Sequence, residues 1–110
     1  MKLLVTALFL LTSVAFAEAQ TFHCKATYNL ETALDEKVNL ESKPVTFGSA
    51  EAFNFHLQKK ADGRIELQAS NMEEPSRSYA TASMKNPGDN VELSVWTNFY
   101  VMEVRCTLMN

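Results

Sequence analysis

Residues 53–69, with the sequence FNFHLQKKADGRIELQA, decide the fold. Apolar residues occupy every second position on both sides of a polar centre, and this period of two is typical of half-buried strands. The tripeptide at 61–63 ends in glycine and predicts a hairpin loop, with Gly63 in the left-handed conformation. A helix starting at Ser49 would also fit the apolar spacing, but only the hairpin makes turn and pattern agree. It places two apolar pairs on one face: Phe55 with Ala69, and Leu57 with Leu67.

The segments before this hairpin are also β-like. Residues 21–30 alternate and predict a strand, whose inner face carries Phe22, Cys24, Ala26, Tyr28 and Leu30. Residues 31–43 predict a loop followed by a strand from about Lys37, with a short helix over 31–36 as the alternative. Pro44 favours an extended conformation over 43–47. The pair Gly48-Ser49 is then expected to break the chain.

After the hairpin, residues 72–77 predict a polar loop and residues 79–84 a further strand. The tetrapeptide at 86–89, Asn-Pro-Gly-Asp, has proline and glycine at the central positions of a type II turn. A hairpin closed there gives three inward pairs: Met84 with Val91, Ala82 with Leu93, and Ala80 with Val95.

The last segment changes phase, because its apolar residues are odd-numbered up to Val95 and even-numbered from Tyr100. One unbroken strand cannot keep both sets on one side. Either a bulge lies at 97–99, or Thr97-Asn98 forms a two-residue turn. The turn is the preferred interpretation, since it keeps three pairs on one face: Val95 with Tyr100, Leu93 with Met102, and Val91 with Val104.

These segments predict an all-β fold, a small antiparallel sandwich or barrel of six to eight strands. Cys24 and Cys106 are the only two cysteines, and both are expected to point inward on terminal strands. In an exported chain the simplest prediction is one disulfide between them.

The first residues predict export. A single lysine precedes an apolar run that ends at Glu18, and small residues suit cleavage after Ala17 or Ala19. Residues 1–19 are therefore predicted to be a cleavable signal peptide, and residues 20–110 a single β domain. The alternative, a membrane anchor, needs about 20 apolar residues, which the run does not reach. The absence of Asn-x-Ser/Thr sequons favours a bacterial periplasm over a eukaryotic secretory route, so the protein is expected to be periplasmic or secreted.

Charge limits the classes of partner. The signal peptide contains Lys2 and Glu18, so its removal leaves the net charge at −3. A mildly acidic chain with scattered cations does not suit nucleic acid. It also lacks the basic amphipathic segment of an anionic-membrane binder, so no membrane insertion is expected after signal cleavage.

No catalytic, metal or cofactor motif stands out. His23 and His56 fall on polar faces of predicted strands, without the further ligands that a metal site requires. No serine has an elbow motif around it, and both cysteines are assigned to the disulfide. We therefore expect no enzymatic activity, no metal and no cofactor.

The candidate binding residues are aromatic. Trp96 and Phe99 are expected to face outward across the last turn, and Tyr79 from the neighbouring strand is expected to join them. Tryptophan and tyrosine are enriched in binding hot spots. The alternative interpretation buries this face, either as a second core layer or under residues 31–43.

A second candidate is the loop at 72–79, whose residues Pro75, Ser76 and Arg77 suit an inhibitor loop that inserts into a hydrolase. The overall design is similar to that of small bacterial periplasmic β-domains, including inhibitors of lysozyme. The function expected from the sequence is a non-enzymatic binding module for a protein or cell-envelope component. The alternative is an inhibitor of a lysozyme or protease, acting through 72–79.

Overall fold

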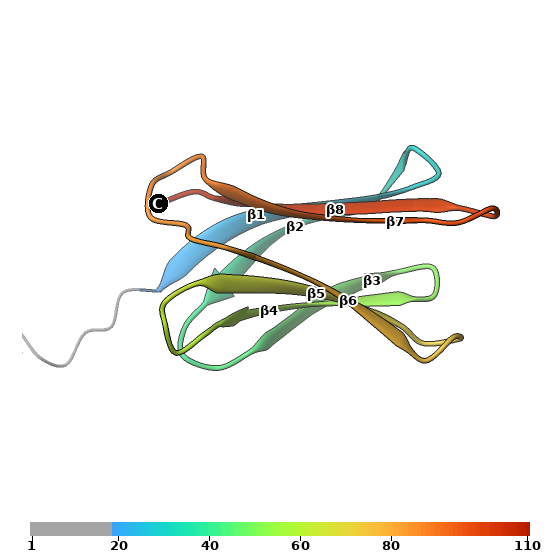
Figure 1. The fold of residues 1–110 in the computed structure, drawn as a ribbon. Coiled ribbons are helices and arrows are strands. Elements are labelled where there is room, and N and C mark those ends of the chain that lie inside the picture. The colour runs from blue at the N-terminus through green and yellow to red at the C-terminus, as the bar shows by residue number, and fades with distance from the viewer. Residues whose placement is uncertain (1–18) are drawn as a thin grey trace, which may run out of the picture.

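A computed structural model describes residues 19–110, which contain eight strands and no helix. The strands are β1 (Gln20–Tyr28), β2 (Glu31–Leu40), β3 (Val45–Ala50), β4 (Phe53–Lys59), β5 (Ile65–Asn71), β6 (Ser76–Ala82), β7 (Asn90–Trp96) and β8 (Val101–Leu108). They form two antiparallel sheets that stack face to face (Figure 1). Sheet A has the order β2-β1-β8-β7, and sheet B has the order β3-β4-β5-β6. The predicted all-β sandwich is confirmed, whereas the predicted signal peptide lies almost wholly outside the described residues.

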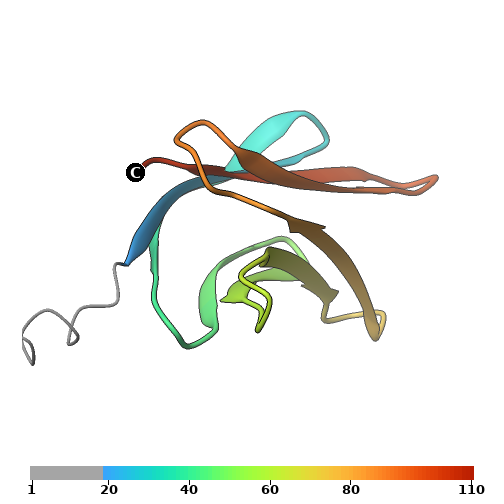
Figure 2. The same cartoon turned by 60° about the vertical axis from the view of Figure 1, so that its left-hand side comes forward.

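The order of strands is that of an up-and-down barrel flattened into two layers. Each strand pairs with its neighbour in sequence except at two seams, where the chain passes from β2 to β3 and from β6 to β7. Figure 2 shows the second crossing, in which the chain leaves sheet B and climbs to sheet A. The last strand, β8, returns to pair with β1. Sandwich and barrel were both expected, and the structure combines the layers of one with the strand order of the other.

The central hairpin forms with the predicted register. In β4 and β5, Phe55 lies opposite Ala69 and Leu57 opposite Leu67. The N–H of Lys60 donates to the carbonyl of Arg64 at 2.8 Å, and Gly63 has φ of 87°. Glycine accepts this left-handed conformation without the steric penalty of a Cβ atom. Local turn chemistry and apolar alternation therefore sufficed to predict this element.

The core lies between the two sheets and is built from the alternate residues of each strand. Its largest fully buried side chains are Phe22, Phe55, Leu40, Leu57, Ile65, Leu67, Met102 and Leu108. Burial of each such side chain contributes about 1.5–3 kcal/mol relative to its exposure to water. No buried side-chain nitrogen or oxygen within residues 19–110 lacks a hydrogen-bond partner.

The segment after β1 differs from the prediction. Neither a loop nor a helix forms at 31–36, because β2 begins at Glu31 and runs to Leu40 as an edge strand. The chain reverses at Asn29 and Leu30, whose φ values are 50° and 71°, so Leu30 leaves the predicted inner face and is exposed. Two consecutive positive φ values mark the tight hairpin turn that matches strand twist. Leucine is a poor residue for this turn, which explains why the sequence pattern missed it.

The predicted break at Gly48-Ser49 is also wrong, since β3 continues through both residues to Ala50. Gly48 has an extended backbone, and the register shifts at this point of the β3–β4 ladder. A Cβ atom at Gly48 would lie 2.7 Å from Cδ1 of Leu34. The glycine therefore permits a close approach between β3 and β2, and it does not make a turn.

The turn at 86–89 forms as predicted, but the pairing drawn from it is wrong. The N–H of Asp89 donates to the carbonyl of Asn86 at 3.0 Å, and Gly88 has φ of 95°. However, β6 belongs to sheet B and β7 pairs with β8 in sheet A. Ala82 and Leu93 pack on the core from different sheets. Their apolar faces are buried whether the chain crosses between the sheets after β6 or forms a hairpin there. The local pattern was therefore unable to distinguish the two topologies.

The phase change after Val95 comes from a turn, as preferred, although the turn lies one residue later than predicted. The N–H of Thr97 donates to the carbonyl of Tyr100 at 2.9 Å, and Val95 lies opposite Met102. The Thr97 hydroxyl accepts hydrogen bonds from the N–H groups of Phe99 and Tyr100, both at 3.1 Å. The register differs from the prediction by two residues, so every side chain keeps its predicted face.

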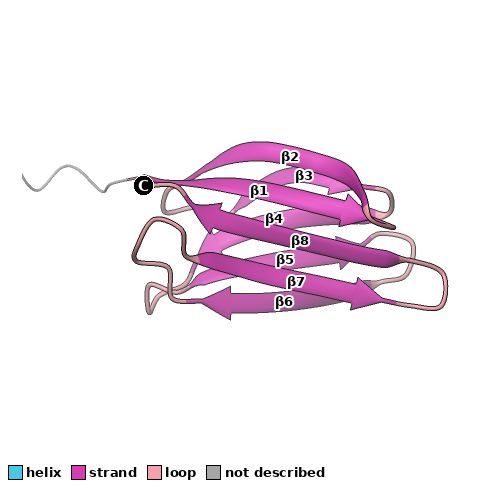
Figure 3. Cartoon of the chain, turned by 90° about the horizontal axis from the view of Figure 1, so that it is seen from above, coloured by secondary structure: helices cyan, strands magenta, loops and turns pink. Residues whose placement is uncertain are grey.

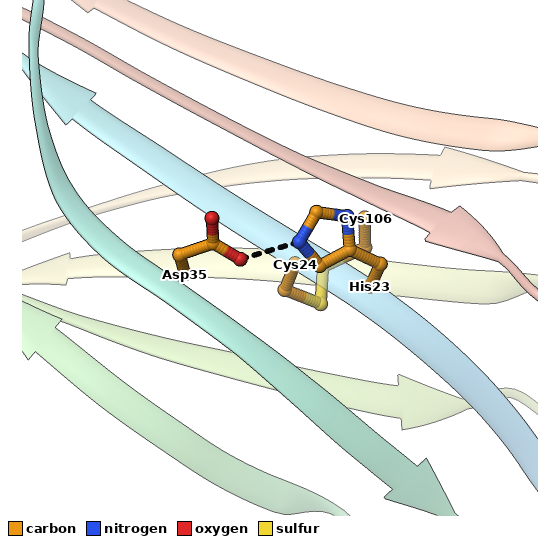
Figure 4. The surroundings of a disulfide bond; sticks show 4 residues. All are labelled: His23, Cys24, Asp35 and Cys106. Atoms are coloured by element: carbon orange, nitrogen blue, oxygen red, sulfur yellow. Dashed lines mark hydrogen bonds and ion pairs between the residues drawn. A yellow bond between two sulfur atoms is a disulfide. The ribbon is translucent and has the colours of Figure 1, made fainter.

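The predicted disulfide is confirmed and joins β1 to β8. Cys24 and Cys106 lie directly opposite each other in the ladder, with their Cα atoms 4.0 Å apart. Figure 4 shows the bond on the inner side of the strands, while the neighbouring His23 points outward and pairs with Asp35 of β2. The two cysteines are 82 residues apart in sequence, so their bond closes nearly the whole described chain.

Replacing both cysteines by alanine is expected to lower the free energy of unfolding by about 2–5 kcal/mol, because the unfolded chain regains the entropy of a long open loop. Urea unfolding followed by circular dichroism measures this loss. Reduction of the wild-type protein should produce a loss of similar size. An unchanged midpoint after complete reduction would show that the bond does not stabilise the fold.

Acid is expected to destabilise the protein partly through Asp89. Its carboxylate accepts hydrogen bonds from the N–H groups of Asn86 and Lys85, both at 2.9 Å, and these bonds hold the pKa of Asp89 below its ordinary value. The resulting stability is present above the ordinary pKa and is lost as the pH falls through the lowered one. Urea midpoints measured from neutral to strongly acidic pH should therefore fall less in Asp89→Asn than in wild type. Equal slopes would contradict this role.

Candidate functional site

Four hairpin turns lie together at one end of the sandwich, which we call the hairpin end. They comprise residues 29–30, 51–52, 72–75 and 97–100, and they connect β1 to β2, β3 to β4, β5 to β6, and β7 to β8. Figures 1 and 3 show these turns on the same side of both sheets, with the β7–β8 turn reaching furthest out. The opposite end holds the loops 41–44, 60–64 and 83–89 together with the carboxyl terminus.

Aromatic contacts between the sheets give this end a common base. The rings of Tyr28 and Tyr100 stack with their centroids 5.4 Å apart, and Phe53 meets Tyr100 edge-on at 5.6 Å. The side-chain amide of Asn71 donates to the Tyr100 hydroxyl at 3.4 Å. Each of these four residues lies within or directly beside a different turn. The base therefore fixes the turns of sheet A relative to those of sheet B.

Two hydrogen bonds between Asn29 and Val101 hold the two turns of sheet A side by side. The N–H of Asn29 donates to the carbonyl of Val101 at 2.8 Å, and the N–H of Val101 donates to the Asn29 side chain at 2.9 Å. Trp96 lies opposite Val101 across β7 and β8. Val101 therefore lies between Trp96, its partner across β7 and β8, and the turn that carries Leu30.

The turns of sheet B are locked in a similar way. The Asn71 side-chain oxygen accepts hydrogen bonds from the N–H groups of Glu73 and Glu74, at 3.0 and 3.1 Å. The N–H of Met72 donates to the carbonyl of Ala52 at 2.8 Å. The two turns therefore support each other.

The hairpin end exposes four large apolar side chains, which we call the apolar tips. Their exposed fractions are 83% for Leu30, 67% for Met72, 73% for Trp96 and 89% for Phe99. The other large exposed apolar residues in the described chain are Tyr79 and Met109, which lie elsewhere. Single exposed apolar residues are ordinary, whereas these four are gathered at one end of the domain, which makes that end the candidate site.

Backbone conformation distinguishes the two ends as well. At the far end, the left-handed positions of the turns are occupied by Gly63 and Gly88. At the hairpin end they are occupied by Asn29, Leu30 and Glu51, the positive-φ residues other than glycine in the described chain. The left-handed conformation costs about 1–2 kcal/mol for a residue with a Cβ atom, although asparagine tolerates it better. Because the Leu30 side chain is exposed, no burial energy offsets this cost. Leucine at this position therefore makes the fold less stable than glycine would.

Four exposed carboxylates lie at the hairpin end, all of them outside the β7–β8 turn. Glu31, Glu51, Glu73 and Glu74 are exposed on or beside three of the four turns, and we call them the acidic rim. Partial burial, Glu51, the Tyr100 hydroxyl and Glu73 together raise the pKa of Tyr28. Glu51 and Glu73 therefore lie close enough to Tyr28 for their charges to contribute to this shift.

Trp96 and Phe99 both lie at the hairpin end, and both are on the surface. The alternative that buried Trp96 in a second core layer or under residues 31–43 is wrong, because β2 pairs with β1 and leaves the outer face of sheet A open. The expected cross-strand position of Phe99 is also wrong, because Val101 takes that place.

Tyr79 does not join them. It belongs to β6 in sheet B and is exposed on the outer face of that sheet. The prediction failed with the β6–β7 pairing on which it rested.

The candidate inhibitor loop at 72–79 is shorter than expected. Residues 72–75 form a tight turn that includes Pro75, whereas Ser76 and Arg77 are the first residues of β6 and pair with Asn71 and Ser70. Arg77 lies beside a groove of about 600 Å³ on sheet B, whose lining includes His56 and Met72. Burial and the nearby Arg77 charge lower the pKa of His56.

Leu30 and Met72 are the site residues that sequence reasoning missed. Leu30 continues the alternation of 22–28, which predicts an inward side chain, and Met72 falls in the predicted polar loop at 72–77. Asn29 was the available signal, since asparagine before a chain reversal tolerates a left-handed conformation. Only the assembled sheets bring both residues to the same end as Trp96.

Two ion pairs lie on the outer face of sheet A. A groove of about 370 Å³ there is lined by His23, Lys25, Glu92, Glu103 and Arg105, among others. Arg105 donates to Glu92 at 3.0 Å, and His23 pairs with Asp35. Within residues 19–110, no cluster of three or more His, Cys, Asp or Glu side chains is arranged to hold a metal ion.

No family model matches the chain, and neither the curated proteins nor the solved structures contain a match. None of the described residues belongs to a helix of the length and apolar character needed to cross a membrane.

Replacing Trp96 by alanine is expected to change the free energy of unfolding by no more than about 0.5 kcal/mol, because the indole is exposed. The matched core change, Phe55→Ala, should cost about 3–5 kcal/mol. Urea unfolding of both variants measures the difference. A loss for Trp96→Ala as large as that for Phe55→Ala would place the indole in the core.

Proposed function

We propose that the chain is an exported, non-enzymatic binding module that engages a protein partner through the hairpin end. The observation that carries this proposal is Leu30, an exposed leucine in a strained left-handed turn. Residues that break a local folding rule without benefit to stability concentrate at functional sites. The other apolar tips share its end of the molecule.

The arrangement suits protein recognition. Loops at one end of a β-sandwich bind protein surfaces in antibody variable domains, where a rigid scaffold positions variable turns. Rigid turns lose little conformational entropy on binding, and large apolar side chains dominate the energy of protein interfaces. The hydrogen bonds at Asn29, Asn71 and Thr97 supply this rigidity here.

The proposed compartment is the periplasm or the extracellular space. The apolar run at the start of the sequence supports export, and structural disulfides are typical of proteins in oxidising surroundings. Inhibition of a hydrolase would be a special case of the same function. It would use the apolar tips, since residues 72–75 make a tight turn rather than an extended loop.

The test is capture of partners from an extract of the envelope and medium of the cells that export the protein. We expect wild type to retain proteins that Leu30→Gly and Phe99→Ser fail to retain. Glycine relieves the strain at position 30, so Leu30→Gly should unfold at the same urea concentration as wild type or higher. Loss of capture then cannot be attributed to unfolding.

The matched control is Met109→Ser, which removes an exposed apolar side chain beyond the last strand. It should capture the same proteins as wild type. Equal capture by wild type, Leu30→Gly and Phe99→Ser would reject the hairpin end as the binding surface.

A further inference from the structure

We infer that the partner is a protein whose binding surface is basic around an apolar recess. This inference rests on the proposed function and adds the chemistry of the partner. Its basis is the distribution of charge around the apolar tips, which supplies the complementarity that steers association.

The four turns of the hairpin end contain no basic residue to balance the acidic rim. Residues 29–31, 51–52, 72–75 and 97–100 contain four glutamates and neither lysine nor arginine. Of the basic residues in the loops and at the strand ends, Arg77 lies near the hairpin end as the second residue of β6. The other five lie at the far end, together with the acidic Glu41, Asp62 and Asp89: Lys43, Lys59, Lys60, Arg64 and Lys85. The molecule is therefore electrically asymmetric along the strands, with its negative end at the apolar tips.

The rim carboxylates are available to a partner. No ion pair between described side chains involves Glu31, Glu51, Glu73 or Glu74. All four are exposed, so pairing them at the edge of an interface requires little loss of hydration. Charges at an interface rim raise the association rate and exclude partners of like charge, while apolar side chains at the centre supply most of the affinity.

The same charges argue against two other occupants. A second copy docked end to end would bring two acidic rims together, and like charges placed opposite each other disfavour association. An anionic lipid surface would repel the rim, and no lysine or arginine in the turns would offset that repulsion. A protein surface with an apolar recess would bury the apolar tips, and basic residues around that recess would pair with the acidic rim.

The test compares two variants that each remove two negative charges. Glu73→Gln with Glu74→Gln alters the rim and leaves the turn intact, because only the backbone N–H groups of these residues bond to Asn71. Glu36→Gln with Glu41→Gln alters two exposed carboxylates in β2 and the loop after it. Capture from the same extract is quantified at low and high salt, alongside wild type and Phe99→Ser.

We expect the rim variant to retain about tenfold less of the proteins that wild type captures at low salt, because steering by charge contributes at least this much to association. The control variant should retain the wild-type amount, and high salt should weaken capture by wild type because it screens the rim charges.

Undiminished capture by the rim variant, with loss in Phe99→Ser, would overturn the basic partner and leave the proposed function standing. Equal capture by wild type and Phe99→Ser would reject both. Lipid vesicles provide the remaining arm, read through the fluorescence of Trp96, the single tryptophan of the chain. A blue shift on addition of phosphatidylglycerol vesicles would replace the protein partner with a membrane, whereas unchanged emission is the expected result.

Discussion

The covalent bond between Cys24 and Cys106 joins the first strand of the domain to the last. All other strand pairs are between neighbours in sequence, which form at small cost in loop-closure entropy. The β1–β8 ladder instead joins segments about 80 residues apart, and it is the most expensive contact to establish. A disulfide within that ladder removes much of the cost and fixes the register. In a domain with a modest core, closure of the strand order depends on this bond.

Closure also builds the candidate site. With Cys24 opposite Cys106, Tyr28 lies opposite Met102, and Asn29 reaches Val101. The turn that carries Leu30 therefore lies beside the hairpin that carries Trp96. A slip of two residues in this ladder would keep every apolar side chain inward and would still separate the two turns. The disulfide thus sets the geometry of a surface far from the sulfur atoms.

The two ends of the sandwich differ in the residues that occupy their left-handed backbone positions. The far end uses Gly63 and Gly88 where the backbone is left-handed, which is the choice that favours stability. The hairpin end keeps Leu30 and Glu51 in that conformation and exposes them. Backbone strain and exposed apolar side chains each destabilise a fold, and both are found at the hairpin end. This concentration of local costs supports a function at the hairpin end more than any single residue does.

Alternation and turn residues in the sequence determined the strands of the central hairpin, the turn at 86–89, the inward Cys24 and Cys106, and the outward Trp96. Each depends on neighbours within a few residues, where backbone geometry dictates the outcome. Only the tertiary structure decided that β6 and β7 belong to different sheets, that Tyr79 lies apart from Trp96, and that Leu30 leaves the core. An alternating strand hides its apolar face equally well against any partner, so the identity of that partner depends on closure of the whole chain.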